Sequence, residues 1–453
     1  DLMLVPFYFL IGGWGTGDRV RATTKFVIYT MAGSLLMLAG AVALGVLSTP
    51  DGGHISFSLA VLQERSVSEG TQQWIVLLFA LAFFVKAPLF PLHGWVPETY
   101  RSTPIVVLAL LSGVLSKVGA YGFLRIVLPV MPEGSQHWQE LFIIVAVFSI
   151  LYGSVLAFSQ DNVRLVVAYS SIAQLGFIVL GIFALEDKGA QGAVLQMLNH
   201  GLVVVPLFLI IGVITMRSGG SESLLRLGGM AVRAPVLAAL FLLVTFATLA
   251  MPGSSNFVGE LLVLFGTFED KLVYGLVASL GVVLAGVYMI RVFQRTMHNR
   301  VAPAVEPREI GRIDLAAVAP LVAVIVALGA YPNFVVDRTE ATTVRKIQPA
   351  RAVAARPFSR AERGQGPLPG GGTHERLRAA GSRHHDRPKQ AIQGSCVGTR
   401  VARHRRSAIR QAHESASHEG LDVGEGHEFV SADPVGRIVG DAMVEKRNPQ
   451  LER

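Results

Sequence analysis

The chain has 453 residues, of which 51% are hydrophobic and 16% are charged, and its formal net charge is +8. Soluble proteins carry about 25% charged residues, so this composition argues against a soluble enzyme and indicates a membrane protein. The single cysteine, Cys396, excludes an internal disulfide and a metal or iron–sulfur site built from cysteines of this chain.

The charge is unevenly distributed and divides the chain near Asp337. Residues 338–453 hold 21 Lys or Arg and 13 Asp or Glu, a net charge of +8, so the residues before them are neutral overall. We predict a transmembrane domain over residues 1–336. Residues 337–453 are basic and poor in aromatic residues, which predicts a polar tail without a core of its own, either disordered or read out of frame.

Apolar segments recur throughout the first 336 residues. A helix that crosses the hydrocarbon core of a bilayer needs about 20 mostly apolar residues. Ten segments are candidates for such crossings, and they lie near 1–12, 24–48, 73–98, 104–130, 138–158, 163–185, 191–215, 234–267, 272–294 and 313–336. The sequence therefore predicts an all-α polytopic membrane protein with about ten spans.

The loops between these segments differ in charge when they are taken alternately. The loops of one set contain twelve Lys or Arg residues, and those of the other set contain three. Basic residues concentrate in cytoplasmic loops. The first set is therefore predicted to be cytoplasmic; it comprises the loops near 13–25, 99–103, 159–164, 216–233 and 295–312.

The first segment is too short to cross a membrane. From Asp1 to about Gly13 it covers about 18 Å at ~1.5 Å per residue, whereas the hydrocarbon core is ~30 Å thick. Asp1 would then lie near the middle of the bilayer. We interpret the domain as truncated at its N-terminus, with further helices expected before Asp1.

Ionisable side chains lie near the middle of several predicted spans, where they are rare and usually functional. Lys86 lies in FFVKAPLFPLHGW, Lys117 in SGVLSKVGAYGF and His200 in LQMLNHGL. Glu260 lies in MPGSSNFVGELL, and Asp1 begins the first segment. All five are candidates for proton transfer.

Buried lysines suit proton transfer because burial disfavours their charged form and a nearby carboxylate favours it. A change in the distance between Asp1 and Lys86 would therefore load or release a proton. His200 could relay protons between Lys117 and Glu260, because imidazole titrates near neutral pH. The structural alternatives are a buried ion pair for a single lysine and an ordinary packing role for His200.

Two predicted helix breaks accompany these residues. Pro88 and Pro91 follow Lys86, and Pro252 precedes Glu260. In transporters, discontinuous helices expose the backbone groups that handle ions. A proline kink without function is the alternative for either break alone. Two breaks, each beside an ionisable residue, favour a functional role.

Seven stretches of the sequence, spread over nearly all of residues 1–336, carry a family resemblance. They are DLMLVPFYFLIGGWG, TKFVIYTMAGSLLMLAG, FFVKAPLFPLHGWVPETY, SGVLSKVGAYGFLR, VRLVVAYSSIAQLGF, QMLNHGL and MPGSSNFVGELLVLFG. In these stretches the chain resembles the antiporter-like subunits of respiratory complex I. That superfamily also includes subunits of Mrp-type sodium/proton antiporters.

The resemblance implies a fold of fourteen helices with two inverted five-helix repeats, and each repeat contains one broken helix. By this resemblance, the chain would begin in the fifth of the fourteen helices. The proton-transfer residues of the family fall on Asp1, where the family has glutamate, and on Lys86, Lys117, His200 and Glu260. Most sister subunits carry lysine at the last position, and glutamate is typical of the M-type branch.

The resemblance implies a proton-translocating membrane-arm subunit of NADH-quinone oxidoreductase in the inner membrane of a bacterium. L-type and N-type antiporter-like chains would be its neighbours. No cofactor is expected in this chain, whereas NADH, FMN, iron–sulfur clusters and quinone are expected in partner subunits. No nucleic-acid binding is expected. Three alternatives remain open: an Mrp-type antiporter subunit, a subunit of a hydrogenase membrane arm and a non-conducting membrane scaffold.

Overall fold

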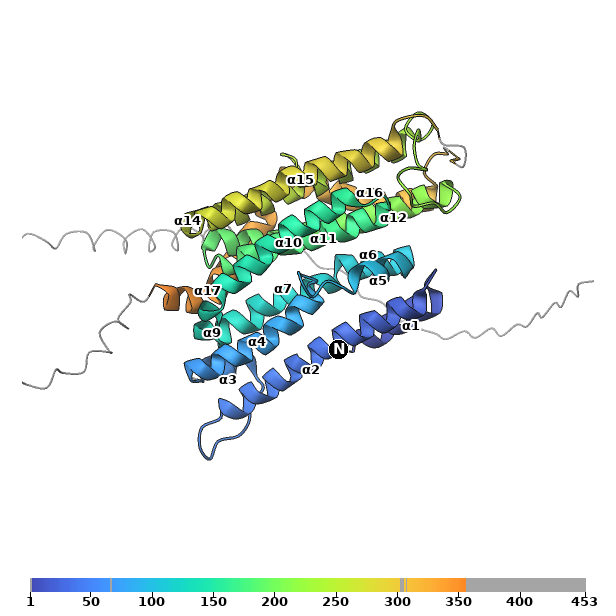
Figure 1. The fold of residues 1–453 in the computed structure, drawn as a ribbon. Helices are drawn as coiled ribbons and strands as arrows, with labels where there is room; N and C mark the ends of the chain where they lie inside the picture. Colours follow the sequence, from blue (N-terminus) through green and yellow to red (C-terminus); the bar gives the residue numbers. More distant parts are fainter. Residues whose placement is uncertain (1, 66, 302–304, 307, 356–453) are drawn as a thin grey trace, which may run out of the picture. The chain divides into compact units, whose positions relative to one another are not determined.

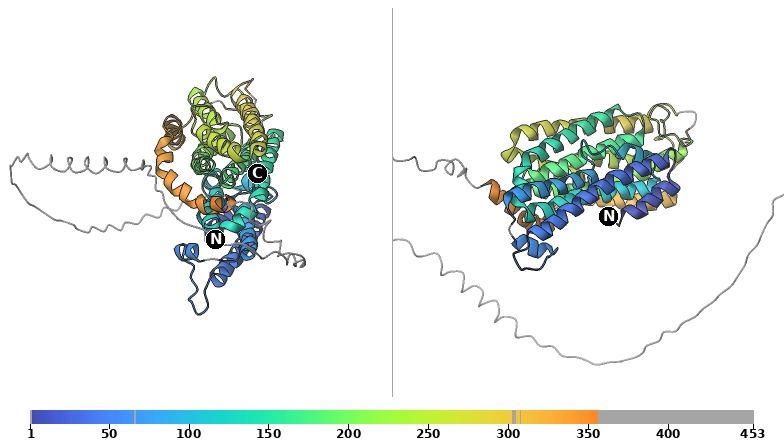
Figure 2. Two further views of the ribbon diagram at one scale, coloured as in Figure 1. Left: turned by 90° about the vertical axis from the view of Figure 1, so that its left-hand side faces the viewer. Right: turned by 60° about the horizontal axis from the view of Figure 1, so that its bottom comes forward.

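The computed structural model describes residues 2–65, 67–301, 305–306 and 308–355 (Figure 1). The regular elements of this part are helices, apart from one isolated bridge between Asn162 and Ser223. Most of the long helices run side by side in a bundle, as both views in Figure 2 show. The all-α prediction is confirmed for the described residues.

Seven helices of the described part are long and apolar enough to cross a membrane. This finding confirms a multi-pass membrane protein. The seven are α2 (Arg19–Leu47), the helical run Ile105–Val130, α10 (Gln139–Ser159), α11 (Val163–Phe183), α12 (Asp187–Arg217), α15 (Leu272–Met297) and α16 (Arg312–Ala330).

The other three predicted segments are short or interrupted. The first is the short helix α1 (Leu4–Trp14). The second is α4 (Glu69–Lys86), which a non-helical turn separates from α5 (Val96–Ser102). The third divides into α13 (Pro235–Thr248) and α14 (Ser255–Asp270). Both predicted helix breaks are therefore confirmed.

The helical run Ile105–Val130 contains irregular turns that the sequence analysis did not predict. Its parts are α6 (Ile105–Gly113), the 3₁₀ turn η1 (Leu115–Lys117), α7 (Val118–Gly122), the π turn η2 (Phe123–Val127) and α8 (Leu128–Val130). Turns of these two kinds inside a helix often mark functional positions. Two short helices, α3 (Leu59–Glu64) and α9 (Pro132–His137), lie in connections between spans.

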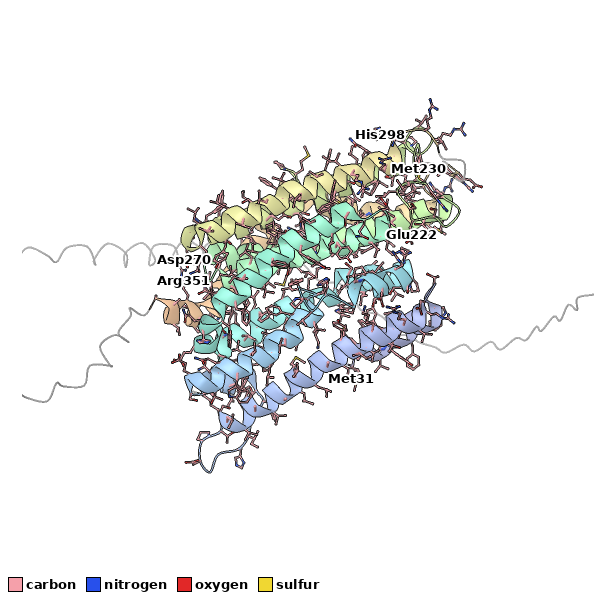
Figure 3. The ribbon with its side chains drawn as sticks, in the orientation of Figure 1. Met31, Glu222, Met230, Asp270, His298 and Arg351 are labelled. Atoms are coloured by element: carbon pink, nitrogen blue, oxygen red, sulfur yellow. The ribbon has the colours of Figure 1, made fainter. Side chains whose placement is uncertain are left out.

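The two ends of the bundle carry different loops. Glu222, Met230 and His298 lie together at one end, and Asp270 and Arg351 lie at the other end (Figure 3). The first three belong to the loops near 216–233 and 295–312, which the charge pattern assigns to one side of the membrane. The structure therefore gathers these basic loops at one end, called the basic-loop end below.

Helix α11 occupies the centre of the bundle, since 94% of its apolar window is buried. Its polar residues Ser170, Ser171 and Gln174 are buried as well. Helices α2, α15 and α16 instead expose much of their apolar surface, as helices that face lipid do. The polar residues of α11 therefore lie in the interior of the bundle.

The last described helix, α17 (Asn333–Ala354), packs against α8, α9 and α12. Its side chains Thr343, Ile347 and Ala350 are buried, and their spacing places them on one face of the helix. The expected start of the polar tail, at residue 337, thus lies inside a packed helix. The remainder of that expected tail, residues 356–453, lies outside the described residues.

Contacts with α12 hold α17 in two places. Near the start of α17, Gln191 Nε2 donates to Val336 O at 2.8 Å and to Thr339 Oγ1 at 3.0 Å. Near its end, Arg351 forms ion pairs with Glu186 at 2.6 Å and Asp187 at 3.0 Å. Helix α17 therefore lies across the end of the bundle opposite the basic-loop end.

Candidate functional site

The structure places four of the five predicted proton-transfer residues. Lys86 is the last residue of α4, Lys117 is the last residue of η1, His200 lies in α12 and Glu260 lies in α14. Asp1 lies outside the described residues, so its expected pairing with Lys86 stays a prediction. Lys86 and Lys117 end their helical segments, and Glu260 lies in the second turn after a break.

The break after Lys86 is closed by local hydrogen bonds. Pro88 has no N–H and disfavours the helical conformation in the residue before it, so α4 ends there. The indole Nε1 of Trp95 donates to Val85 O at 3.0 Å. The backbone N–H of Phe90 donates to Ser149 Oγ of α10 at 3.0 Å. These bonds satisfy groups that the end of the helix leaves without partners.

Lys117 is held by neutral groups. Its side chain is buried, and Nζ donates to Ser112 O at 2.5 Å and to Ser116 Oγ at 3.2 Å. In the 3₁₀ turn, the backbone N–H of Lys117 donates to Val114 O three residues back. Within the described residues, the hydrogen-bond partners of Lys117 are thus a carbonyl and a hydroxyl.

Close packing of two helices brings Lys117 near His200. Helices α6 and α12 approach at Gly113 and Gly201, where an added Cβ on Gly201 would lie 2.8 Å from Gly113 O. Gly113 is next to Ser112, which binds Lys117, and Gly201 is next to His200. Lys117 and His200 are both buried. The structure therefore brings these two predicted residues together.

Glu260 belongs to a buried polar cluster that joins three helices. Its Oε1 accepts from Gln174 Nε2 of α11 at 2.7 Å and from Gln196 Nε2 of α12 at 3.3 Å. Gln196 Nε2 also donates to Gln174 Oε1 at 2.6 Å. We call Gln174, Gln196 and Glu260 the amide–carboxylate cluster. It orients a carboxylate in the interior of the bundle.

The sequence analysis missed Gln174 and Gln196 because it searched for ionisable residues, and an amide is neutral. Both amides lie in otherwise apolar helices, within the stretches SIAQLGF and LQMLNHGL. A buried amide in a membrane needs hydrogen-bond partners. An amide in the middle of a predicted span is therefore a signal that could have identified them.

A glycine makes the cluster possible, and the cluster lies close to His200. An added Cβ on Gly259 would lie 2.4 Å from Gln196 Oε1, so a side chain there would displace the amide. Gln196 and His200 are four residues apart in α12, which places them on the same face, one turn apart. Lys117, His200, Gln196 and Glu260 thus form a line of buried polar groups.

The second break carries polar atoms that lack protein partners. In the part of the chain that the structure describes, buried atoms without a hydrogen bond include Glu260 Oε2, Gln196 Oε1, His200 Nδ1, both side-chain polar atoms of Asn256, and Ser255 Oγ. Buried polar groups in proteins are nearly always hydrogen bonded, often to water. The second break is therefore suited to hold water beside the carboxylate.

Comparison with known proteins reveals relatives of most of the transmembrane part. The family described as "NADH:quinone oxidoreductase/Mrp antiporter, TM" matches residues 1–285. NADH-quinone oxidoreductase subunit M of Mycobacterium tuberculosis is 38% identical over 373 residues, which cover 78% of this chain and 66% of that protein. The chain thus spans about two thirds of the length of this relative.

Two solved structures share the fold. A chain of respiratory complex I from Thermus thermophilus matches with a TM-score of 0.73 at 30% identity, covering 77% of this chain and 73% of that chain. A chain of the Mrp complex from a Dietzia species matches with a TM-score of 0.68 at 22% identity. The match covers 78% of this chain and 74% of that chain, and it shows the fold alone. The interrupted-helix architecture and these matches agree: the chain belongs to the transmembrane family that NADH:quinone oxidoreductase shares with Mrp antiporters.

Proposed function

We propose that this chain is a membrane-arm subunit of a proton-translocating NADH:quinone oxidoreductase and that protons move along Lys86, Lys117, His200 and Glu260. The buried line from Lys117 through His200 to the amide–carboxylate cluster is the observation that supports this proposal. Asp1 remains the proposed partner of Lys86.

The neutral surroundings of Lys117 suit a residue that changes its protonation state. Among the described residues, the hydrogen-bond partners of this buried ammonium are neutral, and burial of a charge without an opposite charge is costly. Loss of the proton relieves that cost, and the same two partners remain available when the proton returns. Lys117 can therefore exchange a proton without a rearrangement of its neighbours.

His200 and Glu260 would take the proton onward. The imidazole of His200 can accept a proton on one nitrogen and release one from the other. The carboxylate of Glu260 has one oxygen fixed by two amides, whereas Oε2 has no protein partner among the described residues. We assign Oε2 as the atom that receives the proton, and Gln174 and Gln196 as residues that position the carboxylate.

We also propose the setting of this subunit. NADH, FMN, iron–sulfur clusters and quinone would be bound by partner subunits, and L-type and N-type chains would be neighbours in a bacterial inner membrane. The name of the Mycobacterium tuberculosis relative and the match to complex I support this setting. A second candidate is sodium/proton antiport, because the Mrp complex shares the fold. Glutamate at position 260 favours the first candidate, by resemblance to the M-type branch.

The test is NADH-driven proton uptake by inverted membrane vesicles that contain the assembled complex. Lys117→Met should lower proton uptake about tenfold or more, since a positioned proton-transfer group contributes at least that much. Lys188→Met is the matched control, because Lys188 is an exposed lysine paired with Glu269. A native gel verifies assembly of both variants.

Each other outcome has a defined meaning. Normal proton uptake by assembled Lys117→Met complex would contradict the proposed route and favour a non-conducting scaffold. A pH gradient produced by a sodium gradient without NADH would favour the antiporter candidate.

A further inference from the structure

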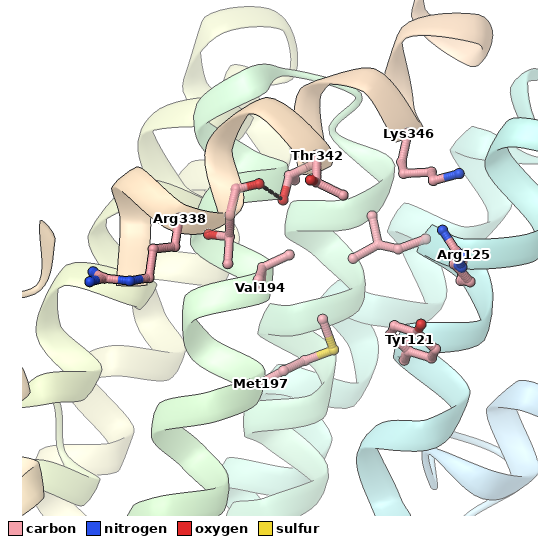
Figure 4. Close-up of a pocket in the computed structure, with 10 residues that line it drawn as sticks. Tyr121, Arg125, Val194, Met197, Arg338, Thr342 and Lys346 are labelled. Atoms are coloured by element: carbon pink, nitrogen blue, oxygen red, sulfur yellow. Dashed lines mark hydrogen bonds between the residues drawn. The ribbon is translucent and has the colours of Figure 1, made fainter. Parts of the chain in front are cut away.

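A cavity of about 350 Å³ lies beneath α17, at the end of the bundle opposite the basic-loop end (Figure 4). Its volume falls in the range of small-molecule sites, about 300–1,000 Å³. The cavity does not include the proton-transfer residues. Its lining residues come from the run Ile105–Val130, from α12 and from α17.

Two basic side chains face each other across this cavity. Arg125 of η2 and Lys346 of α17 lie close together in Figure 4. Partial burial and the charges of Arg125 and Arg345 lower the pKa of Lys346. Among the described residues, the ion pairs at this end of the bundle involve Lys188, Lys271 and Arg351, and not these two cations. A bound anion would relieve the repulsion between Arg125 and Lys346.

The remaining lining supplies hydroxyl groups on one side and apolar groups on the other. Thr342 of α17 contributes a hydroxyl, whereas Thr339 and Thr343 donate theirs to backbone carbonyls of α17. Leu124 and Met197 contribute apolar surface. The third cation, Arg338, points away from the pair and stacks on Phe334 at 3.9 Å from the ring centroid. The site therefore combines two neighbouring positive charges, the hydroxyl of Thr342 and an apolar floor.

An exposed apolar stripe leads from this cavity along the surface of the bundle. It consists of Tyr121, Val118, Val114 and Leu110, which are 56%, 38%, 56% and 55% exposed. Their spacing of three or four residues places them on one face of the helical run. From Leu110 to Tyr121 the stripe covers about 16 Å. This length is roughly half of the ~30 Å hydrocarbon core, or one leaflet.

We propose that this cavity binds the headgroup of an anionic phospholipid, with its phosphate between Arg125 and Lys346 and its acyl chains along the stripe. Charge-assisted hydrogen bonds from basic side chains suit phosphate oxygens. The lipid would connect α17 to the helical run that carries Lys117. This proposal requires only a membrane protein and does not depend on proton transfer.

The experiment uses the intact complex in vesicles of phosphatidylcholine doped with photoactivatable lipid. Phosphatidylglycerol and phosphatidylcholine, each with a diazirine in one acyl chain, are compared as probes, and mass spectrometry measures the labelling of residues 110–125. Phosphatidylglycerol should label this segment at least about fivefold more than phosphatidylcholine, since each basic residue favours anionic lipid. The double variant Arg125→Gln/Lys346→Gln should lose that preference.

Three controls define the result. Arg345→Gln removes a neighbouring charge on α17 outside this cavity and should keep the preference. Arg125→Lys keeps the charge and should retain most of the preference for phosphatidylglycerol. This result would show that the double variant loses the preference because it loses charge. Inorganic phosphate at millimolar concentration should not compete with the lipid.

Any of three outcomes would overturn the proposal. Equal labelling by both lipids would show that no anionic headgroup is selected. Full competition by inorganic phosphate would assign the cations to a free anion. Absence of labelling by either lipid would show that another chain covers the stripe.

Discussion

Both interrupted helices break at proline, but the environments of the two breaks differ. At the first break, after Lys86, the freed backbone groups are bound by Trp95 and Ser149. Aromatic rings fill the turn, with Phe90 lying 5.0 Å from Tyr152 and 5.9 Å from His93 between ring centroids. The first break is thus closed mainly by protein contacts, with His93 Nδ1 as its buried atom without a hydrogen-bond partner in the described part of the chain.

The second break, between α13 and α14, is polar and open to additional hydrogen bonds. Ala250 and Gly253 adopt positive φ angles of 54° and 91°. Beyond them, side-chain atoms of Ser254, Ser255 and Asn256 are buried without protein partners in the described part of the chain. The first proline-containing break is therefore mostly closed by protein hydrogen bonds, whereas the second leaves several buried polar atoms able to bind water. Proton release from the buried line is expected at the second break.

The largest effect is expected from Glu260→Gln. Glutamine keeps the size of the side chain and one oxygen that can accept from Gln174 and Gln196, but it cannot carry a proton. NADH-driven proton uptake should fall about tenfold or more, while a native gel detects normal assembly. Glu269→Gln, on the same helix but in an exposed ion pair, is the control. Full activity of Glu260→Gln would remove the functional difference between the two breaks.

The next effect is expected from Gly201→Ala. The added Cβ would lie 2.8 Å from Gly113 O and force α6 away from α12. Overpacking of this kind should lower the free energy of unfolding by up to about 3 kcal/mol. Proton uptake should fall as well, because Lys117 and His200 move apart. Gly286→Ala is the control, since nothing lies within 4 Å of its Cβ position. Thermal melting and proton uptake that match the control would contradict the close contact.

A moderate effect is expected from Trp95→Phe at the first break. The variant leaves Val85 O without its indole donor. An unsatisfied buried carbonyl should lower the free energy of unfolding by about 1–2 kcal/mol. Proton uptake at a permissive temperature should stay near normal, because this bond is structural. A strong loss of uptake with unchanged melting temperature would mean that the first break also has a direct role.

The smallest effect is expected from Glu309→Gln. Helix α13 begins without a cap from its own residues, and Glu309 accepts from Val236 N at 2.9 Å and Leu237 N at 3.0 Å. Partial burial opposes ionisation of Glu309. The effect of burial is outweighed by hydrogen bonds from the backbone of Ile310, Val236 and Leu237 and by the charge of Arg217. The pKa of Glu309 therefore lies below the ordinary value of 4.5. Loss of such a cap should lower the free energy of unfolding by about 0.5–2 kcal/mol.

The pH dependence of this cap has a defined sign. A carboxylate with a lowered pKa in the folded state stabilises the protein above its ordinary pKa, and this stability is lost as the pH falls through the lowered value. The difference in melting temperature between the native chain and Glu309→Gln should therefore be full above pH 4.5 and shrink below it. A difference that is constant down to pH 3.5 would contradict the carboxylate cap.

The sequence by itself determined the spans, the two breaks and the ionisable residues within them. These features are local: a run of about 20 apolar residues suits one membrane crossing, and Pro88 and Pro252 limit helices through their own covalent geometry. Burial of Lys117, His200 and Glu260 followed from their position in such runs. The role of Asp1 and the nature of the chain after residue 355 stay predictions.

The tertiary structure alone decided how these residues are connected. The contact between Gly113 and Gly201, the amides that bind Glu260 and the Glu309 cap join residues between 64 and 88 positions apart in the sequence. The polar residues of α17 gave no apolar run, yet one face of this helix is buried against the bundle. Contacts of this kind depend on how helices pack, and a periodicity within one segment carries no information about the neighbour that it meets.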